Sequence, residues 1–96
     1  MEKSLENMTL QQILENIMTL QQIASLIGGS WRPVNYGAKP YLDAMYQLDD
    51  IKQNYGADSG ISVVLYFLSN AQTWRGPVAR QVKKELKRRI AKEAKK

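Results

Sequence analysis

The sequence predicts an all-α protein: a compact bundle of four to five helices that ends in a basic C-terminal helix. Two observations lead to this fold class. Apolar residues recur at helical spacing along most of the chain, with Gly and Pro at positions where helices end. The segment most like a β-strand has no evident pairing partner elsewhere. The length of 96 residues and the 44% apolar content suit a single domain over residues 1–96.

The first predicted helix covers residues 4–27, with Ser4 as a candidate N-cap and Gly28-Gly29 as its stop. Its apolar residues follow a heptad pattern and are Leu10, Ile13, Ile17, Leu20, Ala24 and Ile27. The sequence Met-Thr-Leu-Gln-Gln-Ile occurs at residues 8–13 and again at 18–23. A ten-residue step turns a helix to a different face, so we interpret the repeat as a local duplication or a coincidence.

A loop rich in Gly and Pro follows at residues 28–39, and residues 40–76 are predicted to hold the core helices. Pro40 fits the first turn of a short helix, where its missing N–H has no cost. Asp49 or Asp50 is expected to cap a further helical turn.

The most hydrophobic segment runs from Asp58 or Ser59 to about Ala71. Composition alone allows a buried strand at residues 63–68. We favour a buried helix, because apolar residues of this segment follow helical spacing and Asp58 and Ser59 precede them as candidate N-caps. These residues are Ile61, Val64, Leu65 and Leu68.

The last predicted helix covers residues 77–96 and begins at Gly76-Pro77. Its apolar stripe consists of Val78, Val82, Leu86 and Ile90. The stripe fades near its end, so we expect packing to hold the helix to Ile90 and the last six residues to fray. Glu85 and Arg89 are placed as a favourably oriented i,i+4 ion pair.

The net charge of +5 is unevenly distributed. Residues 1–74 hold four basic and seven acidic groups, for a net of −3, whereas residues 75–96 hold ten basic and two acidic groups, for a net of +8. The chain has no Cys and no His, which excludes disulfides, Ser-His-Asp triads and imidazole metal ligands. Helix capping and solubility account for the carboxylates of residues 43–58. We therefore expect a binding protein, not an enzyme, with no catalytic residue, metal or cofactor.

The basic helix carries the strongest functional signal, because closely spaced Lys and Arg neutralise phosphates and release counterions. The predicted contacts to nucleic acid or another anion are Arg75, Arg80, Lys83, Lys84, Lys87, Arg88 and Arg89. The alternative is an ordinary solvated helix face.

Trp31 and Trp74 each precede an Arg and lie close to Gly or Pro, which makes them candidates for aromatic contact with a partner. Alternatively, each ring covers the core at a helix end. The heptad pattern offers a predicted oligomer contact or, alternatively, a core face, and the residues proposed for the oligomer contact are Leu10, Ile13, Ile17 and Leu20.

Several stretches, taken in order, resemble a group of small uncharacterised proteins of tailed bacteriophages. They are residues 33–45, 55–60, 64–71 and 74–76, followed by the basic helix. The resemblance implies a context, since small phage proteins of this size are often non-enzymatic binders of host machinery, nucleic acid, or host defence components and signals.

Two functions follow as expectations. The first is a small non-enzymatic binding protein of phage type that contacts an anionic partner, with nucleic acid ahead of other anions, through its basic C-terminal helix. The alternative is an oligomeric inhibitor or sequestering protein that binds a host protein or a nucleotide signal. The sequence has no signal peptide and no apolar run long enough to cross a bilayer, so we expect no membrane partner and a cytoplasmic location, in the host cell if phage-encoded.

Overall fold

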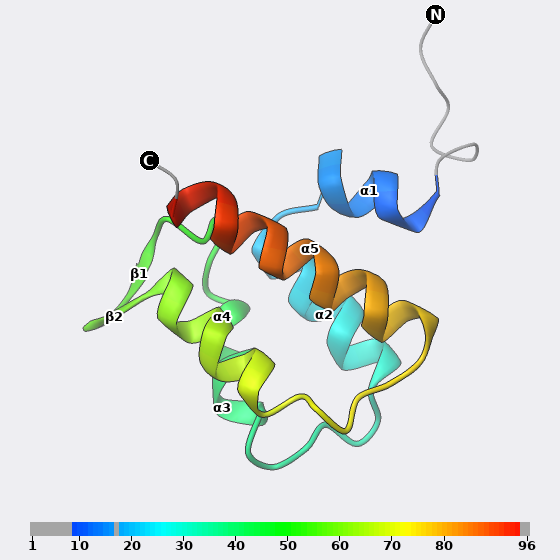
Figure 1. The fold of residues 1–96 in the computed structure, drawn as a ribbon. Helices are drawn as coiled ribbons and strands as arrows, with labels where there is room; N and C mark the ends of the chain where they lie inside the picture. Colours follow the sequence, from blue (N-terminus) through cyan, green and yellow to red (C-terminus); the bar gives the residue numbers. More distant parts are fainter. Residues whose placement is uncertain (1–8, 17, 95–96) are drawn as a thin grey trace, which may run out of the picture.

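The computed structural model of the chain describes residues 9–16 and 18–94, and within them five helices and a two-stranded sheet (Figure 1). In chain order they are α1 (Leu10–Asn16), α2 (Leu20–Ser30), α3 (Lys39–Met45), β1 (Asn54–Tyr55), β2 (Asp58–Ser59), α4 (Gly60–Ser69) and α5 (Pro77–Ala94). The prediction of a mostly helical chain is confirmed.

Helix α5 is the longest element and contacts α1, α2 and α4, while α3 packs against α2 and α4. Figure 1 shows α4 and α5 running side by side, with α1 lying across the other flank of α5. Every helix contributes to the largest fully buried side chains, which include Leu14, Ile27, Met45, Phe67 and Leu86. The core is therefore shared by all five helices that the structure describes.

The prediction of a single helix over residues 4–27 is wrong, because the chain forms α1 and α2 with a break between them. At the start of α2, the Thr19 hydroxyl oxygen accepts from the Gln22 backbone N–H at 3.1 Å. The Gln22 side-chain oxygen accepts in return from the Thr19 N–H at 2.9 Å. This reciprocal pair is a capping box, which begins a new helix and ends the earlier one.

The ten-residue repeat has a structural meaning that its helical phase does not predict. Thr9 and Gln12 exchange the same two hydrogen bonds ahead of α1, at 2.9 and 3.1 Å. Each copy of the repeat is thus a helix start. Gly28-Gly29 lies inside α2 and does not stop it. The proposed Ser4 cap and the heptad residue Ile17 lie outside the described residues.

Asp50 caps a single turn, as predicted, because its carboxylate accepts from the Lys52 N–H at 2.9 Å, and a short hairpin follows this turn. Strands β1 and β2 pair antiparallel, and Gly56 in the turn has φ of +60°, a conformation that favours glycine. The Gly60 N–H donates to the Gln53 carbonyl at 2.7 Å, and a side chain at Gly60 would collide with the Ile51 carbonyl. Glycine therefore lets the start of α4 close against the turn before the hairpin.

The buried helix predicted in the hydrophobic segment is confirmed as α4, and Ser59 caps it by accepting from the Ser62 N–H at 3.0 Å. Pro40 lies in the first turn of α3, also as predicted. Helix α5 begins at Pro77 and continues through Ala94, and Ile90 is the last of its apolar residues that packs against the core. The fraying expected after Ile90 stays a prediction. Residues 95–96 lie outside the described part of the chain.

The capping box at Thr19 is expected to contribute measurably to stability. Replacing Thr19 with Ala removes the acceptor for the Gln22 N–H and should lower the free energy of unfolding by about 1 kcal/mol, whereas Thr19→Ser should keep most of it. Urea denaturation followed by circular dichroism measures the change. Thr73→Ala, at an exposed turn residue, is the matched control. An equal effect of Thr19→Ala and Thr73→Ala would show that the cap does not hold the start of α2.

Candidate functional site

A buried carboxylate lies on α5, among the basic residues. The side chain of Glu85 is only 2% exposed. One of its oxygens accepts from Arg88 Nε at 2.7 Å, and the other accepts from Arg88 Nη2 at 2.8 Å and from Arg89 Nε. The predicted i,i+4 pair of Glu85 and Arg89 is confirmed. A charge this deeply buried is tolerated only when it is paired and fully hydrogen-bonded, which these two arginines achieve.

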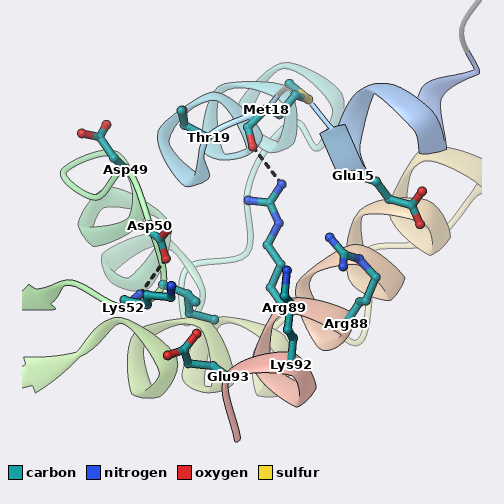
Figure 2. Close-up of a pocket in the computed structure, with 11 residues that line it drawn as sticks. Glu15, Met18, Thr19, Asp49, Asp50, Lys52, Arg88, Arg89, Lys92 and Glu93 are labelled. Carbon is teal, nitrogen blue, oxygen red and sulfur yellow. Dashed lines mark hydrogen bonds between the residues drawn. The ribbon is translucent and has the colours of Figure 1, made fainter. Parts of the chain in front are cut away.

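Arg89 also joins α5 to the junction of α1 and α2. Its Nη2 donates to the Leu14 carbonyl at 2.6 Å and to the Met18 carbonyl at 2.8 Å. Leu14 lies in the last turn of α1, where carbonyls have no partner within the helix. Figure 2 shows the Arg89 side chain reaching from α5 to Met18. The prediction that Arg89 contacts an external anion needs correction, because its guanidinium is occupied by acceptors inside the protein.

The pKa values at this cluster follow from the same contacts. Burial raises the pKa of the Glu85 carboxyl, but the hydrogen bonds and charges of Arg88 and Arg89 lower it by more, so its pKa lies below the ordinary value of 4.5. The pKa of Arg88 is raised by its hydrogen bonds to Glu85, with a further contribution from the charge of Glu15 on α1. The cluster therefore stays ionised at neutral pH.

A pocket of about 320 Å³ opens beside Arg89, where the α1–α2 junction meets the turn before the hairpin and the end of α5 (Figure 2). Its lining carries charges of both signs in equal number. The acidic members are Glu15, Asp49, Asp50 and Glu93. The basic members are Lys52, Arg88, Arg89 and Lys92. Because the two signs balance here, this pocket does not attract a polyanion.

The outward face of α5 has a different character. An open depression of about 410 Å³ is lined by four side chains, and all four are cationic: Arg80, Lys83, Lys84 and Lys87. Arg75 lies close enough to this group for its charge to act on Lys83. We call these five residues the basic face. Within the part of the chain that the structure describes, no carboxylate lines the depression.

Lys83 ties the basic face to the turn before α5. Its ammonium donates to the Trp74 carbonyl at 2.6 Å. Burial lowers the pKa of Lys83, and the neighbouring charges of Lys87 and Arg75 lower it further. An ammonium surrounded by like charges is stabilised when an anion binds beside it. The five cations thus share one electrostatic environment that an external anion would relieve.

The two tryptophans pack against each other. Their rings stack with centroids 5.7 Å apart and planes 14° apart, and Trp31 also meets Phe67 edge-on at 6.3 Å. Trp74 is 4% exposed, so the prediction that its ring contacts a partner is wrong and the alternative, a cover for the core, is confirmed. Trp31 is half-buried in the same stack. The arginines that follow them, Arg32 and Arg75, are exposed.

One of the predicted oligomer contacts is used entirely within the chain. Leu20 is fully buried in the core, which excludes it as a contact between subunits in this fold. Leu10 and Ile13 are half-buried on α1, and Ile17 lies outside the described residues. Leu14, which the heptad pattern did not include, is fully buried. The break between α1 and α2 changes the helical phase and so removes the continuous stripe.

No protein family, no curated protein and no solved structure matches this chain. The resemblance to small phage proteins therefore stays a prediction. None of the helices in the described residues is both long enough and apolar enough to cross a bilayer. Residues 9–16 and 18–94 bring together no group of three or more acidic side chains able to hold a metal ion.

Removing Arg89 should destabilise the fold more than removing Arg88. Arg89→Ala leaves the Leu14 and Met18 carbonyls without this donor and weakens the pairing of Glu85, so the free energy of unfolding should fall by about 2–4 kcal/mol. Arg88 is 42% exposed, and water can replace part of its contact. Denaturant titration of Arg89→Ala, Arg89→Lys and Arg88→Ala measures the order. A smaller loss for Arg89→Ala than for Arg88→Ala would contradict this assignment.

The low pKa of Glu85 makes part of the stability dependent on pH. Because the folded pKa lies below the unfolded one, the contribution is present above the ordinary value of 4.5 and is lost as the pH falls through the folded pKa. The gap in unfolding free energy between wild type and Glu85→Gln should therefore be largest at about pH 7 and should shrink on acidification. Denaturant titrations across this range measure it. A gap that does not change with pH would show that Glu85 is not the linked group.

Proposed function

We propose that the protein is a small non-enzymatic nucleic-acid-binding protein, in which the basic face on the C-terminal helix α5 contacts the phosphate backbone. The observation that carries this proposal is the depression lined by Arg80, Lys83, Lys84 and Lys87 without a carboxylate among its described lining residues. The resemblance to small phage proteins fits the proposal, because proteins of that size are often binders and not enzymes.

The spacing of the basic face suits a polyanion better than a small one. Arg80, Lys84 and Lys87 lie on successive turns of α5, which rise by about 5.4 Å each. A nucleic-acid strand presents its phosphates at a comparable repeat, so several cations engage at once and release several counterions. Such contacts hold the backbone without reading its bases. The proposal is accordingly for binding without sequence specificity through this face.

The division of charge supports the same function. Glu85 pairs with Arg88 and Arg89 on the inner side of the helix, so the carboxylate does not cancel the outer cations. Arg88 is 42% exposed and lies at the border between the two sets. The oligomeric alternative has less support, because Leu20 belongs to the core. Nucleic acid thus remains ahead of other partners in this proposal.

The binding should depend steeply on salt. The affinity for a labelled single-stranded oligonucleotide, measured by fluorescence anisotropy between about 50 and about 200 mM salt, should fall with a log–log slope of about −3 if the basic face makes four to five phosphate contacts. Lys84→Ala should make the slope shallower by about 0.7 to 1.

The matched control is Lys39→Ala, which removes the same charge from an exposed position on α3, outside the basic face. This variant should leave the slope unchanged. Absence of binding at low salt would overturn the proposal, as would equal effects of Lys84→Ala and Lys39→Ala.

A further inference from the structure

An apolar groove lies directly beside the basic face, between α4 and α5. Its volume is about 350 Å³, and its lining residues are Leu65, Leu68, Ser69, Lys87, Ile90 and Ala91. Lys87 lines both this groove and the basic depression. The two surfaces therefore meet at one side chain, and a ligand can lie across both. Figure 1 shows the two helices that form the walls running side by side.

The groove presents carbon surface to solvent. Leu65 is 47% exposed although it is a large apolar residue. The Ser69 hydroxyl donates to the Leu65 carbonyl at 3.0 Å, so its proton is already used inside α4. The cationic group among the lining residues is Lys87, at the border with the basic face. This combination suits a ligand with a flat apolar part attached to an anionic part.

We propose that the groove receives a base of a single-stranded nucleic acid whose phosphates lie on the basic face. The inference rests on the proposed function and adds the class of nucleic acid. In a single strand the bases are accessible next to their phosphates, whereas a duplex stacks them inside and must unpair one at a cost. A base that lies on Leu65 and Ile90 has part of its apolar surface removed from water, which favours binding, while Lys87 contacts the adjoining phosphate. The preferred ligand is therefore single-stranded.

The size of the groove argues for a base over a protein segment. Six residues line it, whereas a stable protein interface takes roughly 20–30 residues from each partner. Its lining offers carbon surface and one cation, with the Ser69 proton occupied, so it discriminates little between bases by hydrogen bonding. Larger rings cover more apolar area, and purines should bind more tightly than pyrimidines.

The test compares two labelled oligonucleotides of equal length, one normal and one with abasic sugars, by anisotropy at low salt. Both carry the same phosphates, so their salt slopes should agree. The normal strand should bind about tenfold more tightly, the gain expected from removing part of a base's apolar surface from water. A duplex of the same length carries twice the phosphates but no base free to enter the groove, so changes to the groove should leave its affinity unchanged. Equal affinity for the normal and abasic strands would overturn this inference while leaving the proposed function intact, and absence of binding to every strand would overturn both.

Two variants locate the effect in the groove. Leu65→Ser removes its largest exposed wall, and Ala91→Leu fills it at an exposed helical position. Each variant should lower the affinity for the normal strand several-fold and leave the affinity for the abasic strand unchanged. Tyr36→Ser, at an 87% exposed residue outside the groove, is the control. Binding to the abasic strand reports whether the basic face is folded. A variant that loses affinity for both strands therefore has a folding defect, and the other variant then decides. An unchanged preference for the normal strand in a folded variant would overturn the assignment.

Discussion

The carboxylate of Glu85 retains its charge inside the protein only because Arg88 and Arg89 donate to it from the following turn of α5. The remaining donor capacity of Arg89 reaches the Leu14 and Met18 carbonyls, on segments more than 70 positions away in the sequence. One guanidinium thereby joins α5 to the last turn of α1 and to Met18, just before the N-cap of α2. The orientation of α5 about its own axis follows from this arrangement, since Glu85 and Arg89 must face inward together.

That orientation decides which cations remain available. With Arg89 directed to the α1–α2 junction, the side chains on the opposite face of α5 are those that line the basic depression. The ion-paired set stabilises the fold, and the basic face is proposed to bind phosphates. The apolar groove adjoins the basic face because α4 packs along the same helix, with Lys87 at the border. A single helix thus combines a structural role with the proposed binding role, and the rotation fixed by Glu85 separates them.

Features encoded by neighbouring residues were predictable from the sequence, and features that join distant segments were not. Helix α4 follows from the Ser59 cap and a local apolar pattern, and the Glu85–Arg89 pair follows from i,i+4 spacing. The break before α2 was also encoded locally, in the Thr-x-x-Gln capping boxes, but the heptad pattern across it favoured one helix. The stacking of Trp31 on Trp74 and the apolar groove depend on how separate elements pack. Density of charge along a helix likewise does not distinguish an inward Arg89 from an outward Lys84.

The separation of the basic face from the ion-paired arginines is tested most directly by nuclear magnetic resonance of arginine Nε and lysine Nζ groups in the intact protein, during titration with a single-stranded oligonucleotide. The signals of Arg75, Arg80, Lys83, Lys84 and Lys87 should shift together with saturation, and the Arg89 Nε–H should keep its position and its protection from exchange with water. A dominant shift at Arg89, with the basic face unchanged, would contradict the account.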